Sequence, residues 1–357
     1  MTASHRRTYI DWARGLAVLL MIEAHTTDAW TRPGDKGSVA YALTVIVGGF
    51  AAPLFLWLAG LGVVLAASRI AARTGDRVEA VEATTRRGLE IFILAFLFRL
   101  QAFIASPPST PLKLFRVDIL NVMGPAMVGT ALLWMAANSA AARVAIYAIA
   151  ATAFAMLTPI VRATAALDWL PIWVQWYLRP AGEFTTFTLL PWAGFVFAGA
   201  AVGVLIVEAD ERSERRLHVG VATAGAALVA LGFLAAAQPS IYRSSSFWTS
   251  SPTWFAIRTG ILMMALTACY ATERIELFRR ARLAAWLAKM GRSSLFIYWI
   301  HVELVYGYAS WLWRGRLPLW GTALAYAAFC MAMYGAVLLR DRIVDSWRRI
   351  GRVQEAL

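Results

Sequence analysis

The stretch YIDWARGLAVLLMIEAHTTDAW, residues 9–30, decides the class of this protein. It is apolar and long enough to cross a bilayer as a helix, which takes about 20 residues. It nevertheless carries ionisable side chains, which within a membrane span normally face the interior of the helix bundle or a water-filled cavity. The stretch therefore predicts a membrane helix with one functional face. Its ionisable residues are Asp11, Arg14, Glu23, His25 and Asp28.

The rest of the chain has the same apolar character. Of its 357 residues, 60% are hydrophobic and only 15% are charged, a composition that excludes a soluble domain. We predict an all-α polytopic membrane protein with about ten transmembrane helices in a single domain over residues 1–357. The ten apolar segments cover residues 10–28, 42–67, 88–105, 118–138, 143–160, 185–207, 217–237, 254–271, 293–313 and 319–340.

The loops between these segments alternate between an arginine-rich set and a set rich in Pro, Ser, Thr and Trp. Short arginine-rich loops stay in the cytoplasm, so both termini are expected there. The net charge of +13 comes from arginines at the ends of apolar runs, which excludes nucleic acid as a partner. The basic, amphipathic stretch 275–289 is expected to lie along the inner membrane surface. The four histidines are too scattered for a metal motif, so no metal site is predicted.

The first helix has a polar stripe. At about 100° per residue, Asp11 and Arg14 at the cytoplasmic end share a face with His25 and Asp28 near the outer end. A simpler interpretation makes Asp11 a helix cap and Arg14 a side chain that reaches to headgroups. Glu23 points nearly opposite, lies deeper than His25, and is expected to need a partner on another helix.

The span 293–313 repeats the theme. Ser294, Tyr298 and His301 lie on one face of it, and Arg292 marks its cytoplasmic entrance. His301 is either a hydrogen-bonded core residue or part of a site.

The span 118–138 opens at the outer level with Asp118 and Asn121, which are three residues apart and therefore neighbours on a helix. The alternative role for this pair is a plain helix cap. Arg99 is expected to form an ion pair with such an acid. Elsewhere, Pro191 predicts a kink and Gly199-xxx-Gly203 predicts a packing face.

Several stretches together resemble the integral-membrane acyltransferases. IDWARGLAVLLMIEAH is similar to the first helix of their catalytic domain and GGFAAPLFLWLAG to the second. ILNVMG, LLPWAGFVFAGAAVG and GRSSLFIYWIH resemble later stretches in the right order. The branch that the chain resembles is the heparan-α-glucosaminide N-acetyltransferase catalytic domain with its bacterial relatives. That resemblance implies transfer of an acyl group, by default acetyl, from cytoplasmic acetyl-CoA to a sugar or glycan on the far side of a bacterial inner membrane.

The resemblance also implies roles for individual residues. The family motifs map onto Asp11, Arg14, Gly15, His25, Tyr298 and His301. In the lysosomal enzyme the catalytic histidine lies in the loop after the first helix, where this chain has Asp28 and Asp35 and no histidine. We therefore assign the general base to His25.

Acyl transfer needs groups at both ends of such a helix. The CoA phosphates suit arginine, which binds phosphate through a planar fork of donors. The expected donor-binding residues are Asp11, Arg14, Gly15, Arg86, Arg87, Arg292, Ser294 and Tyr298. His25 would act as the base, oriented by Asp28 or Asp118. The candidate oxyanion donors are Asn121, Tyr298 and His301.

Two other functions are compatible with the sequence. The alternative to an acyltransferase is a multi-helix transporter or flippase, although no inverted repeat is evident. A non-catalytic scaffold would leave Glu23, His25 and His301 without a role. The expected partners are acyl-CoA, a saccharide or glycan acceptor and the bilayer, and a homodimer is left open. The acceptor is left open among an amino sugar, an envelope glycan and a small metabolite.

Overall fold

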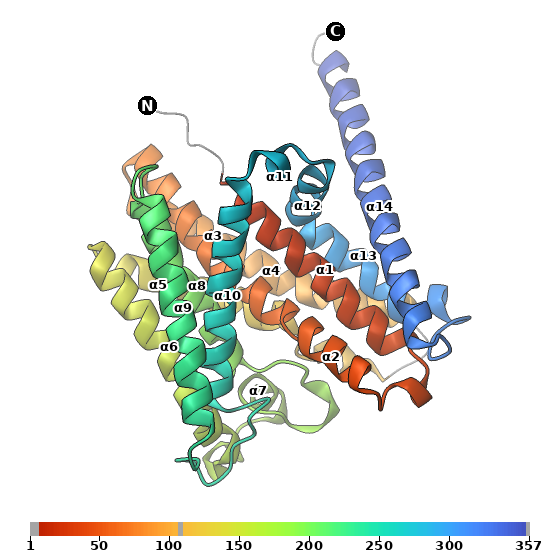
Figure 1. Ribbon diagram of the computed structural model, residues 1–357, viewed down its shortest axis with the longest axis horizontal. Helices are drawn as coiled ribbons and strands as arrows, with labels where there is room; N and C mark the ends of the chain where they lie inside the picture. Colours follow the sequence, from red (N-terminus) through yellow and green to blue (C-terminus); the bar gives the residue numbers. More distant parts are fainter. Residues whose placement is uncertain (1–6, 106–109, 355–357) are drawn as a thin grey trace. The chain divides into compact units, whose positions relative to one another are not determined.

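The computed structural model describes residues 7–105 and 110–354, which fold into helices joined by loops and short 3-10 turns (Figure 1). In that described part the chain forms fourteen α-helices and no extended sheet. Their bounds are α1 Thr8–Trp30, α2 Val39–Gly48, α3 Ala51–Thr74, α4 Arg77–Ala105, α5 Ile119–Ala136, α6 Ala140–Ala163, α7 Ile172–Leu178, α8 Leu189–Glu208, α9 Glu214–Ala236, α10 Pro252–Glu273, α11 Glu276–Arg280, α12 Arg282–Arg292, α13 Ser294–Tyr306 and α14 Leu319–Gln354.

The all-α prediction is confirmed, and many of these helices suit a membrane. Within residues 7–105 and 110–354, seven candidate spans are long and apolar enough to cross one: Val39–Thr74, which joins α2 and α3, and α5, α6, α8, α9, α10 and most of α14. Helices α1 and α4 have 23 and 29 residues, but charged side chains interrupt their apolar surface. Helix α13 has 13 residues and would extend about 20 Å, less than the ~30 Å of a hydrocarbon core. The count of ten spans and the cytoplasmic termini stay predictions.

Two predicted segments do not correspond to single helices of the structure. The segment 42–67 is not one helix, because the chain breaks at Gly49 and Phe50 between α2 and α3. Pro53 lies in the first turn of α3. Backbone N–H groups in a first turn have no hydrogen-bond partner within the helix, so the lack of an N–H in proline costs no hydrogen bond there. The segment 293–313 is also too long, since α13 ends at Tyr306 and Gly307 adopts an extended conformation. The predicted kink before Pro191 is confirmed: Leu190 has non-helical backbone angles inside α8.

The chain divides into two compact units, each built from separated segments. The first contains residues 1–51, 105–107 and 272–357, and the second contains residues 52–104 and 108–271. The chain passes between them repeatedly, and the single domain over 1–357 stays a prediction. Each unit has its own central helix.

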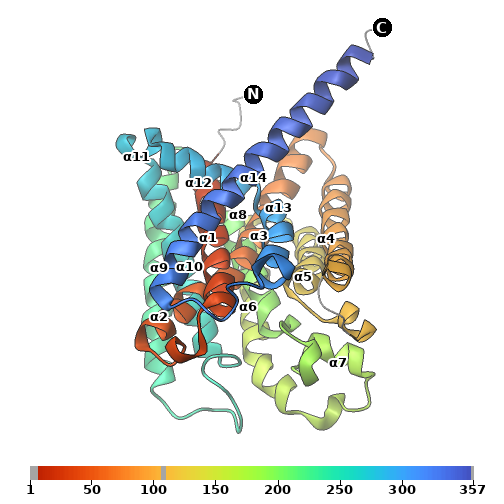
Figure 2. The same cartoon turned by 90° about the vertical axis from the view of Figure 1, so that its right-hand side faces the viewer.

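Helix α1 is central to the first unit, where it packs against α2, α12, α13 and α14 (Figures 1 and 2). Two glycines bring α1 and α12 together: a Cβ on Gly291 would collide with the backbone of Asp11, and one on Gly15 with the backbone of Leu287. The basic stretch expected along the membrane surface forms α11 and α12, and α12 is thus a packed element of this unit. At the other end of α1, buried Trp30 donates from Nε1 to the carbonyl of Val305 at 3.3 Å.

Helix α8 is central to the second unit, and small residues again set its contacts. A Cβ on Gly199 would overlap the backbone of Trp57 in α3, and one on Gly60 would overlap the backbone of Val196. Gly203 faces Leu61, whose Cα would lie 3.1 Å from an added Cβ. The packing role predicted for the Gly199-xxx-Gly203 pattern is therefore confirmed. Close helix approach through small residues is how membrane helices associate without a hydrophobic driving force.

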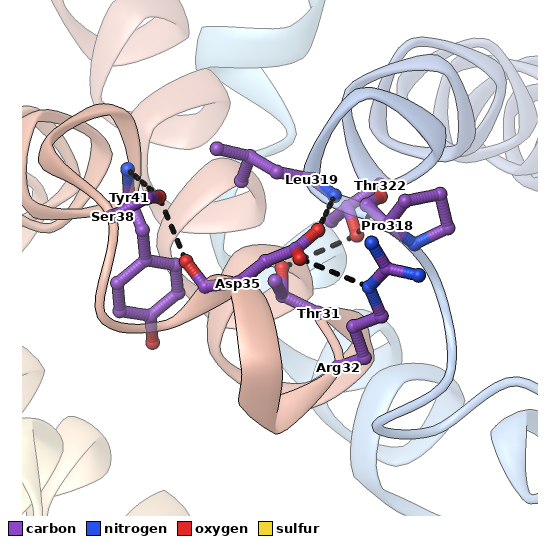
Figure 3. A network of polar contacts seen from close by, with 8 residues as sticks. All are labelled: Thr31, Arg32, Asp35, Ser38, Tyr41, Pro318, Leu319 and Thr322. Atoms are coloured by element: carbon purple, nitrogen blue, oxygen red, sulfur yellow. Dashed lines mark hydrogen bonds and ion pairs between the residues drawn. The ribbon is translucent and has the colours of Figure 1, made fainter.

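The loops after α1 and before α14 bind each other within the first unit (Figure 3). Thr31 and Leu317 form an isolated parallel bridge. Asp35 accepts a hydrogen bond from the backbone N–H of Leu319 at 2.9 Å and another from Arg32 Nε at 2.9 Å (Figure 3). These two bonds, the first more than the second, hold the pKa of Asp35 below its usual value. A carboxylate at the start of α14 also suits the positive end of that helix.

Candidate active site

Helix α1 brings His25 against His301 of α13. His25 Nδ1 lies 2.8 Å from His301 Nε2, which is hydrogen-bond distance. The two ring planes differ by 8° and their centroids are 5.0 Å apart. His301 is fully buried, whereas His25 is partly exposed. His301 is thus a hydrogen-bond partner of His25. Orientation of His25 by Asp28 or Asp118 stays a prediction.

Asp28 lies one turn beyond His25 and forms the rim of this site with Tyr306 and Lys36. Tyr306 Oη donates to Asp28 Oδ2 at 2.9 Å, and its ring meets the His25 ring edge-on at 5.6 Å between centroids. Lys36 Nζ lies 3.6 Å from Asp28 Oδ1 and donates to the Asp28 carbonyl at 2.6 Å. The Asp28 side chain remains 60% exposed, which leaves a carboxylate at the C-terminal end of α1 available to a polar ligand.

Asp118 and Asn121 belong to the second unit, where they start α5. Asp118 Oδ1 accepts from the N–H of Ile119 at 2.8 Å, and Asn121 Oδ1 accepts from the N–H of Asp118 at 2.9 Å. This is a reciprocal cap, the alternative that the sequence left open. The expected ion pair between Arg99 and Asp118 is confirmed. A catalytic role for the two residues stays a prediction.

Asn121 has one further contact. Its Nδ2 lies 3.4 Å from Tyr177 Oη. Burial raises the pKa of the Tyr177 hydroxyl, and the hydrogen bond with Asn121 opposes that shift. Asn121 is itself buried, so its amide is held on both sides. The amide thus has a defined orientation.

The N-terminal end of α1 carries a buried acid between two arginines. Asp11 is 4% exposed, and its carboxylate lies 3.6 Å from Arg14 Nη1 and 3.8 Å from Arg292 Nη1. Both guanidinium groups remain partly exposed, at 34% and 42%. The close approach that Gly15 permits is that of α12, since the backbone of Leu287 occupies the space beside it. A donor-binding role for Gly15 stays a prediction.

Two cationic residues that sequence reasoning missed join this end. Arg340 of α14 donates from Nη2 to Ser293 Oγ at 3.0 Å. Lys289 of α12 lies 2.9 Å from a carboxylate oxygen of Asp341. These contacts attach α14 to the junction between α12 and α13. In the sequence, Arg340 is one of many charged residues at the end of an apolar run. No pattern in its neighbouring residues could have predicted its contact with Ser293.

The remaining residues predicted to bind the donor are Ser294, Tyr298, Arg86 and Arg87. Ser294 and Tyr298 are half-buried on α13, and the Tyr298 ring centroid lies 5.9 Å from that of His301. Arg86 and Arg87 are exposed on α4 of the second unit, where Arg87 pairs with Glu90 at 2.9 Å. Within the described residues no group of three or more His, Cys, Asp or Glu side chains is arranged to hold a metal ion.

Glu23 takes its hydrogen bond from its own helix, from Thr27 Oγ1 at 3.2 Å to Oε1. The partner that we expected on another helix is replaced by packing, because a Cβ on Gly48 of α2 would collide with Glu23 Oε2. That buried oxygen has no hydrogen-bond partner among the residues described. Glu23 therefore packs against α2.

The comparison with protein families gives one match. The family model described as "Heparan-alpha-glucosaminide N-acetyltransferase, catalytic" matches residues 6–243, which is more than half of the chain. The chain belongs to this family. The matched region includes His25, Asp28, Asp11 and Arg14, and it ends before α13, so His301 and Arg292 lie outside it. No curated protein matches the chain. The family and the seven apolar spans make this chain an integral-membrane member of an acetyltransferase family.

Proposed function

We propose that the chain transfers an acetyl group from cytoplasmic acetyl-CoA to an amino or hydroxyl group of a sugar or glycan on the outer side of the membrane. One observation carries the proposal: α1 holds Arg14 beside Asp11 near its start and His25 beside His301 further on. At about 1.5 Å per residue, the positions of Arg14 and His25 are about 16 Å apart along the helix. An extended pantetheine arm has a comparable length.

The reaction is proposed as a direct transfer. The acceptor nitrogen or oxygen attacks the thioester carbonyl, a bond to the acyl carbon forms, and the bond from that carbon to sulfur breaks. His25 takes the proton of the attacking atom and returns it to the leaving thiolate, so the products are the acetylated acceptor and CoA thiol. Imidazole suits this role because it titrates near neutral pH.

The negative charge that develops on the carbonyl oxygen needs hydrogen-bond donors. The candidates are Tyr298, one turn before His301 on α13, and Asn121, whose amide is held by the α5 cap. Tyr298 has the stronger support, because its ring lies near that of His301 in the same unit. Asn121 stays a candidate from the sequence.

The donor nucleotide is assigned to the cationic end of α1. Arg14 and Arg292 converge on Asp11, and Arg340 and Lys289 reach the same α12–α13 junction. Partly exposed guanidinium groups that a carboxylate holds in place are suited to bidentate phosphate contacts. Ser294 follows directly at the start of α13. We propose Arg340 and Lys289 as additions to this set, beside Arg86 and Arg87 from the sequence.

The acceptor is assigned to the rim formed by Asp28, Lys36 and Tyr306. A carboxylate accepts from sugar hydroxyls or from an ammonium group, and a tyrosine ring can lie against the apolar face of a pyranose. Asp28 lies one turn from His25, so an acceptor bound at the rim would present its nucleophile to that imidazole. The family name favours an amino sugar. The proposal places the chain in a bacterial inner membrane.

Purified full-length protein in lipid nanodiscs tests the function. Acetyl-CoA labelled in the acetyl group is offered with a panel of amino sugars and glycan fragments, and both CoA thiol release and label in the acceptor are measured. We expect acceptor-dependent release by the wild type. His25→Ala should abolish it, and Thr223→Val, an exposed change on α9, should leave it intact.

A transporter would behave differently in the same samples. It would leave acetyl-CoA unconsumed, and its substrate would accumulate in sealed vesicles without covalent change. Full turnover by His25→Ala would show that His25 is not the general base, but it would not contradict the proposal that the chain is an acetyltransferase. Absence of thiol release with every acceptor, together with vesicle uptake of an unmodified sugar, would overturn the acetyltransferase proposal.

A further inference from the structure

The partners of His301 determine which of its ring nitrogens carries a proton. Its Nδ1 lies 2.9 Å from the carbonyl oxygen of Ile297 and 2.9 Å from that of Tyr298, both in the preceding turn of α13. A carbonyl oxygen can only accept, so Nδ1 must carry a hydrogen and donate to both. His301 is fully buried, and a second proton on Nε2 would place a charge in that interior, which is costly. The neutral ring therefore has its lone pair on Nε2.

The protonation of His301 also determines which ring nitrogen of His25 carries a hydrogen. Its Nδ1 lies 2.8 Å from the Nε2 of His301, which is an acceptor, so Nδ1 of His25 must be the donor. A neutral imidazole carries a hydrogen on only one of its nitrogens. The lone pair of neutral His25 is consequently on Nε2, the nitrogen on the far side of the ring from His301.

We propose that His301 is a positioning residue: it holds His25 in the Nδ1–H tautomer and thereby makes Nε2 of His25 the basic atom. The catalytic consequence rests on the proposed function, whereas the tautomer does not. When Nε2 takes a proton, Nδ1–H still donates to His301, and a hydrogen bond from a charged donor is stronger than one from a neutral donor. His301 thus stabilises the protonated base as the carboxylate does in a Ser-His-Asp triad, but without a negative charge.

This arrangement changes the role that the sequence suggested for His301. Its only N–H is used by the two carbonyls of its own helix, which leaves none for an oxyanion. The ring of His25 is also held from a second side by the edge of Tyr306, which is itself bonded to Asp28. Two neighbours therefore define the orientation of His25 before any substrate binds.

Nitrogen NMR of the full chain in nanodiscs tests the tautomer without any activity. The protein is labelled with ¹⁵N-histidine, and the resonances of His25 and His301 are assigned by their loss in His25→Gln and His301→Gln. We expect both residues to show a protonated Nδ1 and a pyridine-type Nε2. In His301→Leu, which removes the acceptor, His25 should shift toward the Nε2–H tautomer. An Nε2–H signal from His25 in the wild type would overturn the inference.

Steady-state kinetics test the consequence. His301→Leu should lower kcat by about 10- to 100-fold, less than the about 10⁴-fold that follows loss of a triad carboxylate, and leave KM for acetyl-CoA unchanged. His301→Gln should recover most of the loss, because its amide oxygen can accept from His25 Nδ1. His218→Gln makes the same change at a buried histidine of α9 and should leave kcat unchanged.

The two experiments separate this inference from the proposed function. The expected tautomers without any acetyl transfer would refute the function and keep the role of His301 in orienting His25. Acetyl transfer with unchanged kcat in His301→Leu would refute the positioning role and keep the function. A loss of kcat that His301→Gln fails to recover, with His25 unchanged in its tautomer, would also count against positioning.

Discussion

Replacing Gly291 by alanine should force α12 away from α1. An added Cβ would lie 2.7 Å from the backbone nitrogen of Gly15, 3.1 Å from Arg14 Cβ, and nearer still to the carbonyl oxygen of Asp11. Ordinary contact begins at 3.4 Å, so the gap to Gly15 alone must open by 3.4 − 2.7 = 0.7 Å. The neighbours are mainly backbone atoms, which cannot rotate out of the way as a side-chain tip could.

The expected free-energy change follows from two opposing effects. Overpacking a tight contact typically destabilises by about 1–3 kcal/mol, and a contact made by backbone belongs at the upper end. Replacing glycine by alanine inside a helix contributes about 1 kcal/mol in the opposite direction. The net loss for Gly291→Ala is then about 1–2 kcal/mol, or about 1–3 °C in the thermal midpoint for a chain of this size.

Thermal unfolding in detergent, followed by loss of the monodisperse chromatographic peak, measures the effect. Gly335→Ala is the matched control, because Gly335 is exposed in the middle of α14 and an added Cβ there meets nothing within 4 Å. That variant should be as stable as the wild type or slightly more so. Equal midpoints for Gly291→Ala and Gly335→Ala would refute the reasoning that backbone contact between α1 and α12 sets their spacing.

Three further changes probe other contacts. Trp30→Ala should destabilise by about 3–5 kcal/mol, because it empties a buried aromatic site, and should lower the urea midpoint accordingly. Arg77→Met should lose about 1–2 kcal/mol, since Arg77 caps the carbonyls at the end of α5, whereas Arg73→Met at an exposed pair should change stability by less than about 0.5 kcal/mol. Because the folded pKa of Asp35 is lowered from 3.8, its stabilising contribution is present above that pH and is lost as pH falls through the lowered value. Midpoints of Asp35→Asn and wild type measured from pH 7 to pH 3 should therefore converge at the acid end, and a constant difference would contradict this.

The apolar segments were predictable from the sequence because a bilayer permits only helices or closed barrels to cross it. Runs such as 143–160 and 217–237 meet that condition with little charge, and the ends of α6 and α9 agree with them to within three residues. The segments 42–67 and 293–313 each contain the end of a helix, which hydropathy alone cannot detect. Gly49 follows the end of α2 and Gly307 follows the end of α13, but glycine also occurs inside other helices of the chain, as at Gly199.

For the candidate site, the sequence could predict which residues are candidates but not the contacts that they make. His25 and His301 stood out because polar groups in apolar helices require a reason. Their surroundings needed coordinates: Asp118 caps α5, and His301 lies at hydrogen-bond distance from His25. Gly15 matched a family motif, and the structure shows it against the backbone of α12.

The sequence by itself determined that this chain is a helical membrane protein, that it resembles the acetyltransferase family to which it belongs, and that His25 and the arginines mark opposite ends of one helix. These properties are local, since hydropathy and spacing along a helix depend on neighbouring residues. Only the tertiary structure decided that His25 meets His301 across 276 residues and that Arg340 reaches Ser293. Such pairs depend on how whole helices pack, and many side chains far from the site contribute to that packing energy.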